Sequence, residues 1–119
     1  MPRPFAIALC LCTLPLSVHA QSFDCAKAST ATETAICDSQ SLSSLDSEMA
    51  ALSWSYDQVP MMMGASGDRQ DAKQSFLTKR DACGSDTTCL TQAYDTRIAT
   101  LKSEISASMQ DYCTAIQLC

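Results

Sequence analysis

Apolar residues recur at steps of three and four through the middle of the chain. The run comprises Leu42, Leu45, Met49, Leu52 and Tyr56. Residues three and four apart lie on one face of an α-helix, so these side chains form a narrow apolar stripe. The pattern predicts a helix from about Ser41 to about Asp57 that packs against another helix.

Two later segments have the same spacing. Past Asp68, an expected N-cap, one face carries Ala72, Phe76, Lys79 and Cys83, with Leu77 beside it. A longer stripe then follows through Leu90, Tyr94, Ile98, Leu101, Ile105, Met109 and Tyr112. Since no stretch alternates apolar and polar residues long enough to form a strand, we expect helices only.

A short helix is predicted nearer the N-terminus. Thr30 is followed three residues later by Glu33, which matches a capping box, and the helix continues through Cys37. The sequence therefore predicts an all-α fold, an antiparallel bundle of three main helices plus this short N-terminal helix.

The segment from Arg80 to Leu90 joins the last two main helices. Gly84 can adopt the left-handed conformation past a helix end, and Asp86 can cap the next helix. Cys83 and Cys89 flank this turn. If they pair, the turn is a helical hairpin with a covalent link.

Residues 1–20 have the features of a secretory signal. Arg3 precedes a mostly apolar run from Phe5 to Leu16, and small residues before Gln21 predict cleavage after Ala20. The apolar run is too short to span a bilayer, so no membrane insertion is expected. The predicted mature protein is one domain, residues 21–119, in the periplasm or outside the cell.

The predicted mature chain is acidic, with seven basic and thirteen acidic residues and a net charge of −6. This balance argues against nucleic acid and anionic membranes as partners and is compatible with a cationic protein.

Six cysteines remain after removal of the signal, an even number that favours disulfides in an exported chain. We expect the local pairs Cys25–Cys37, Cys83–Cys89 and Cys113–Cys119, because each closes a short loop. The first two would each contribute about 2–3 kcal/mol in the chain-entropy model. Zinc binding is the alternative, but the spacings are wider than in usual zinc pairs.

Catalytic chemistry has little support in the sequence. The single histidine, His19, leaves with the signal, so the mature chain has no imidazole base or ligand. Asp46 and Glu48 are two residues apart and do not share a helix face. We therefore expect no enzyme activity, cofactor or metal.

Charged residues near the hairpin are expected to have structural roles. Arg80 complements a helix C-terminus, and Asp81 could pair with Arg97 on the facing helix to fix the register. Plain surface charges with little net energy are an equal alternative.

Trp54 lies about 160° from the middle of the apolar stripe of its helix. The favoured interpretation is that another segment of the chain covers Trp54. Small neighbours such as Ser43 and Ser47 would allow the N-terminal helix or the C-terminal cysteine tail to pack there. In the alternative, Trp54 and the loop residues Met61, Met62 and Met63 form one exposed partner-binding patch.

Several short motifs occur along the chain up to about Leu101. They are Phe23-Asp24-Cys25, Lys27-Ala28, Thr30, Glu33, Ala35-Ile36-Cys37, Leu42, Leu45-Asp46, Glu48-Met49, Arg80-Asp81-Ala82-Cys83-Gly84, Asp86, Cys89-Leu90, Ala93-Tyr94, Arg97-Ile98 and Leu101. Together they resemble the DUF1311 family, the N-terminal domain of LprI-type lysozyme inhibitors. Phe76 stands where the family usually has tryptophan, and the third cysteine pair is an addition.

The resemblance implies an exported helical protein and, for some members, lysozyme inhibition. We therefore expect a binding protein with lysozyme as the first candidate partner, acting as a plug in which the Val59-to-Gly67 loop enters the substrate cleft. The alternative is a non-inhibitory envelope scaffold or stress-adaptation module that binds another periplasmic protein.

Overall fold

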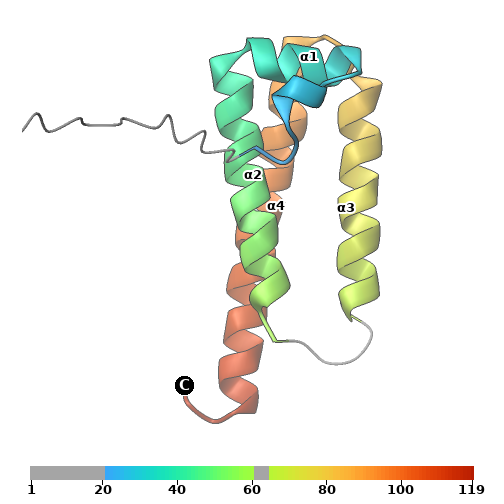
Figure 1. The fold of residues 1–119 in the computed structure, drawn as a ribbon. Coiled ribbons are helices and arrows are strands. Elements are labelled where there is room, and N and C mark those ends of the chain that lie inside the picture. Colours follow the sequence, from blue (N-terminus) through green and yellow to red (C-terminus); the bar gives the residue numbers. More distant parts are fainter. Residues whose placement is uncertain (1–20, 61–64) are drawn as a thin grey trace, which may run out of the picture.

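The computed structural model describes residues 21–60 and 65–119, and every regular element in these two ranges is helical (Figure 1). The predicted all-α fold is confirmed. The elements are the short 3-10 turn η1 (Cys25–Lys27) and the helices α1 (Ala31–Asp38), α2 (Gln40–Gln58), α3 (Ala65–Ala82) and α4 (Thr87–Ala115).

The three long helices run in alternating directions, so that α3 is antiparallel to α2 and α4, while α1 lies across one end (Figure 1). Helices α2 and α4 make the most extensive contact. The buried core consists of Ile36, Leu42, Met49, Phe76, Leu90, Tyr94, Ile98 and Leu101. All of these residues except Ile36 come from the three predicted stripes.

The helix ends follow the local sequence signals. The Thr30 hydroxyl accepts from the Glu33 N–H, and the Glu33 carboxylate accepts from the Thr30 N–H, which completes the predicted capping box. Asp86 caps α4 by accepting from the N–H groups of Thr88 and Cys89, both at 3.0 Å. Gly84 has a φ of +56°, a conformation that costs glycine little.

All three predicted disulfides are present: Cys25–Cys37, Cys83–Cys89 and Cys113–Cys119. The first joins η1 to α1, the second links α3 to α4 across the hairpin, and the third closes the chain back onto the end of α4. Three disulfides in a chain of this size indicate an oxidising environment, as in the periplasm or the extracellular space. The predicted signal, residues 1–20, lies outside the described residues.

A buried carboxylate connects three parts of the chain. Asp46 is fully buried on α2. It accepts hydrogen bonds from the Ser22 N–H at 2.7 Å, the Ser22 hydroxyl at 2.7 Å and the Tyr94 hydroxyl of α4 at 2.8 Å. Burial raises the pKa of Tyr94 well above its usual range and the Asp46 carboxylate raises it further, so the hydroxyl stays protonated and donates.

Helix α3 packs less closely than the other two long helices. Only Phe76 and Arg80 are buried along it, whereas Lys79, predicted on the apolar face, is exposed. The helix also begins at Ala65, so Asp68 lies in the first turn and is not the N-cap. Polar residues dominate α3, and only a narrow strip of its surface contacts the rest of the bundle.

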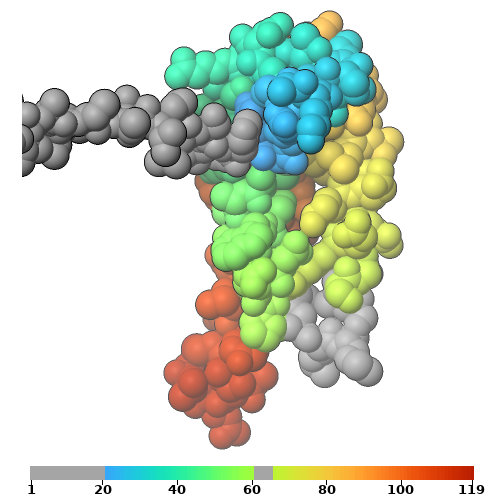
Figure 2. All heavy atoms as spheres, in the orientation of Figure 1, coloured from blue at the N-terminus to red at the C-terminus, as the bar shows by residue number. Residues whose placement is uncertain are grey.

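Helix α4 is longer than its neighbours. Its 29 residues span about 43 Å, against about 28 Å for the 19 residues of α2. The C-terminal end of α4 therefore projects beyond the rest of the bundle (Figure 2). Met109 and Tyr112, predicted to continue the packed stripe, are 51% and 39% exposed, because none of the other helices in the described ranges covers them. No helix within the two described ranges has the length and hydropathy of a membrane span.

Replacing Asp46 should strongly destabilise the fold. Asp46→Ala leaves the buried Tyr94 hydroxyl without its acceptor and should lower the free energy of unfolding by about 2–4 kcal/mol. Tyr94→Phe should cost about 1–3 kcal/mol, and the double variant should cost less than the sum of the two. Urea unfolding measures all three, with the exposed Asp95→Ala as the matched control. Additive effects would contradict the direct hydrogen bond.

The cap of α1 should respond to acid. Backbone N–H groups of Ser29 and Thr30 donate to the Glu33 carboxylate and lower its pKa. Because the folded pKa is lowered, the stabilisation is present above the ordinary carboxyl pKa and is lost as the pH falls through the lowered value. NMR titration of Glu33 should show this midpoint below that of an unstructured glutamate, and Glu33→Gln should remove the corresponding part of the acid dependence of stability.

Candidate protein-binding surface

An open groove of about 490 Å³ runs between α2, α3 and the N-terminal segment. Residues from each of these parts line it, among them Phe23, Met49, Trp54, Lys73, Phe76 and Arg80. The groove exists because α2 and α3 touch each other little and are both held chiefly by α4. Its walls are mainly apolar and its rim is charged, a composition that suits protein recognition.

Trp54 lies on the rim of this groove and is 67% exposed. The favoured prediction, that another segment of the chain covers Trp54, is therefore wrong. The N-terminal segment does cover the same side of α2, but nearer the start of the helix: Gln21 donates to the Ser43 hydroxyl at 2.6 Å, and that hydroxyl donates to the Ile36 carbonyl at 2.8 Å. Trp54 is three turns further along α2, beyond this cover.

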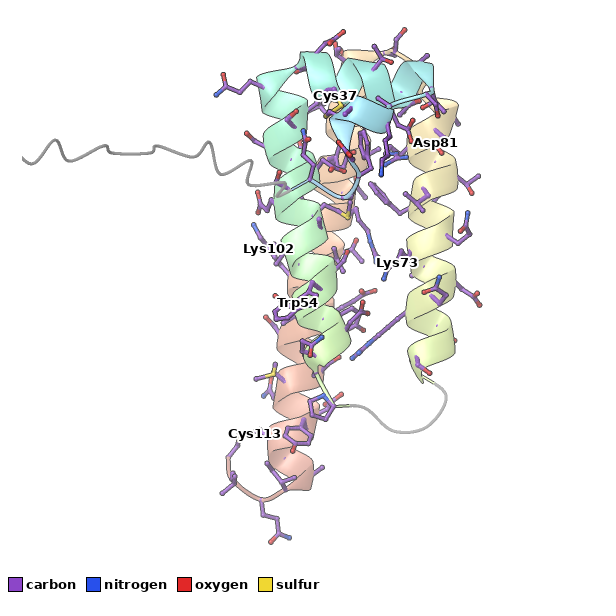
Figure 3. All side chains as sticks on the ribbon, in the orientation of Figure 1. Cys37, Trp54, Lys73, Asp81, Lys102 and Cys113 are labelled. Atoms are coloured by element: carbon purple, nitrogen blue, oxygen red, sulfur yellow. A yellow bond between two sulfur atoms is a disulfide. The ribbon has the colours of Figure 1, made fainter. Side chains whose placement is uncertain are left out.

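An ion pair between α2 and α3 crosses the groove. Lys73 reaches from α3 towards α2, and its ammonium nitrogen is 3.2 Å from Asp57 Oδ2 (Figure 3). Both side chains remain about 40% exposed, so the pair contributes little to stability and can rearrange on contact with a partner. Near the same end, the Arg69 guanidinium stacks on Tyr56 at 4.0 Å and donates to the Val59 carbonyl at 3.2 Å.

Arg80 forms part of the inner wall and is 6% exposed. Its Nε and Nη2 donate to Asp81 Oδ1 at 2.9 and 2.7 Å, and its guanidinium lies 5.9 Å from the Phe23 ring centre. Burial alone would lower its pKa, but the hydrogen bond to Asp81 and the nearby Tyr94 oxygen outweigh that effect, and the pKa is raised. The structural role expected for Arg80 agrees with this arrangement.

The suggested Asp81–Arg97 contact is absent from the structure. Asp81 pairs instead with its sequence neighbour Arg80, and Arg97 lies 3.9 Å from Glu104 on its own helix. The hairpin register is therefore held by the Cys83–Cys89 disulfide and by core packing rather than by this ion pair.

The suggested methionine patch can be assessed only at Trp54. Met61, Met62 and Met63 lie outside the described residues. Val59, the first residue of the expected plug, is 7% exposed and packs inward, so it belongs to the folded body and not to a contact surface. Trp54 is therefore the described residue that carries the patch hypothesis.

Asp46 is the only buried carboxylate among the described residues, and its oxygens accept three hydrogen bonds. In residues 21–60 and 65–119 no cluster of histidine, cysteine and carboxylate side chains is arranged to hold a metal ion. Zinc ligation by the cysteines is excluded because all six are paired as disulfides.

Asp46 and Tyr94 were not recognised from the sequence as hydrogen-bonded partners. Asp46 is four residues after Leu42 and three before Met49, which places it on the inward face of α2. That position was the available signal, because a carboxylate there must be buried and must find donors.

Comparisons with protein-family models, with curated proteins and with solved structures found no match. The resemblance to the DUF1311 family rests on the sequence motifs alone.

Because Trp54 is exposed, replacing it should change the stability of the fold very little. Trp54→Ala should change the free energy of unfolding by about 0.5 kcal/mol or less, whereas Phe76→Ala in the core should cost about 3–5 kcal/mol. Because Trp54 is the single tryptophan, native fluorescence reports on it alone. Its emission should be that of a hydrated indole and should be readily quenched by acrylamide; a blue-shifted, protected emission would contradict the exposed position.

Proposed function

We propose that this protein is exported and acts by binding another protein, with Trp54 as the anchor of the contact. The observation that carries the proposal is the 67% exposure of this tryptophan on the rim of an apolar groove. Tryptophan is enriched among the residues that dominate interface energies. The exposed indole can insert into a partner, and the apolar groove beside it can accept a side chain of that partner.

The proposed partner is lysozyme, on two grounds. The sequence motifs resemble a family in which some members inhibit lysozyme. The predicted mature chain also carries a net charge of −6, and every described acidic side chain other than Asp46 has some contact with solvent. Such a surface increases the association rate with a basic enzyme and does so less at high salt.

In the proposed mechanism the inhibitor blocks the substrate cleft without chemical change to either protein. The Trp54 side chain and the groove rim bind the edge of the cleft. The expected plug ran from Val59 to Gly67, but Val59 is buried and α3 begins at Ala65, so the proposed plug is the shorter connection between α2 and α3. The exposed Asp57 and Lys73 are placed to exchange their mutual ion pair for charged groups of the enzyme.

A titration tests this function. Purified residues 21–119 with intact disulfides, added to hen-type and goose-type lysozymes on cell walls, should slow lysis of at least one type in proportion to inhibitor concentration. Trp54→Ala should weaken inhibition at least tenfold, because loss of an interface anchor typically costs about 2 kcal/mol or more. Met109→Ala, another exposed apolar position far from the groove, is the matched control and should inhibit normally.

Normal lysis at a large molar excess of folded protein would remove lysozyme as the partner. In that case a pull-down from envelope extract tests the scaffold alternative. Capture of a resident envelope protein by the native chain but not by Trp54→Ala would favour a scaffold over an inhibitor.

A further inference from the structure

The projecting end of α4 carries an apolar surface that the bundle leaves uncovered. Its large exposed side chains are Met109, Tyr112, Ile116 and Leu118, with Leu118 80% exposed. The first three continue, at steps of three and four, the stripe that packs into the core through Leu90, Tyr94, Ile98 and Leu101. The same helix face is thus an interior surface for its first half and an exposed one for its second.

This end of the chain is nearly free of charge. From residue 105 to residue 119 the only side chain that is charged at neutral pH is that of Asp111. Asp111 lies about 130° around the helix from the centre of the exposed stripe. A partner that approached the stripe would therefore meet apolar and uncharged groups, in contrast to the acidic surface elsewhere.

A disulfide ring holds the last exposed side chains in place. Cys113–Cys119 encloses Ile116 and Leu118, and the Leu118 N–H donates to the Cys113 carbonyl at 3.2 Å. Gln117 adopts a φ of +58°, which is unfavourable for a residue with a side chain. The ring keeps two apolar side chains in solvent at a fixed position, which lowers the entropy cost of binding through them.

We propose that this surface, formed by Met109, Tyr112, Ile116 and Leu118, joins two copies of the chain in a symmetric dimer. The stripe of one copy packs antiparallel on the same stripe of the second, as in an isologous helix pair. This inference is independent of the proposed inhibitor function. The dimer contact involves the C-terminal half of the α4 stripe, whereas the N-terminal half packs into the core.

Charge favours a second copy as the occupant. The apolar stripes are neutral and can face each other without repulsion. Antiparallel pairing also places the two acidic bundles at opposite ends of the joined helices, further apart than the Debye length of about 8 Å at physiological salt. A basic partner would gain no charge attraction at this uncharged surface.

Size limits the strength of the dimer. Four large side chains per copy form a small contact, below the roughly 1,200 Å² of total buried area typical of stable complexes. The dimer should therefore be in rapid exchange with the monomer and should depend on protein concentration.

Sedimentation velocity of residues 21–119 with intact disulfides tests the proposal. The weight-average mass should rise towards twice the monomer value between concentrations on the order of 10 µM and 1 mM. Met109→Glu and Leu118→Glu should each raise the dimer dissociation constant at least tenfold, while circular dichroism stays unchanged because both residues lie outside the core. Ala51→Glu is the matched control, at an exposed position on α2, and should leave association unchanged.

Two further variants define the geometry. In an antiparallel pair centred on these side chains, Met109 of one copy faces Ile116 of the other, so adding Ile116→Lys to Met109→Glu should restore part of the lost association. The double substitution Cys113→Ser with Cys119→Ser, which opens the ring, should weaken association without unfolding the bundle.

A monomer at every concentration would overturn the proposal. So would association that Met109→Glu and Leu118→Glu leave intact, or that Ala51→Glu abolishes. Flotation with phosphatidylcholine vesicles tests whether the surface binds a membrane instead. If the protein stays monomeric and binds vesicles, and Leu118→Glu abolishes that binding, the surface binds lipid and the dimer proposal is wrong. If Leu118→Glu no longer dimerises but still inhibits lysozyme, dimer formation and the proposed inhibitor function are independent of each other.

Discussion

The buried Asp46 carboxylate is the constraint on which the arrangement of this protein depends. Carrying a carboxylate into an apolar core is costly unless donors surround it, and its donors come from the N-terminal segment and α4. The three segments must therefore meet in one relative position. A shift of one apolar stripe along another costs little, whereas a misplaced Tyr94 hydroxyl would lose its carboxylate acceptor and would remove one of the three donors to Asp46.

Much of the fold follows from local sequence, and the exceptions have physical reasons. Gly84, Asp86 and the capping box of Thr30 and Glu33 act within a few residues, so their roles could be predicted. The disulfides followed from short loops in the same way. The burial of Asp46 could not be predicted from α2 alone, because its donors are 24 and 48 residues away along the chain.

The candidate site was less predictable for a related reason. The position of Trp54 on the far side of α2 was correct, but whether another segment covers it depends on how far the N-terminal residues extend along that helix. The hydrogen bonds of the N-terminal segment to α2 reach Ser43 and Asp46 but not Trp54, which remains in solvent. Similarly, the stripe of α4 was read correctly, but the sequence gives no direct measure of where the neighbouring helices stop.

The position of the first described residues has a consequence for maturation. Ser22, and Gln21 beside it, supply hydrogen bonds to α2, and these would be the first two residues of a chain cut after Ala20. A protease that cut two residues further on, or an aminopeptidase that trimmed the new end, would remove the Ser22 donors to the interior carboxylate. If the predicted cleavage after Ala20 takes place, the stability of the folded interior would depend on the exact position of the cut.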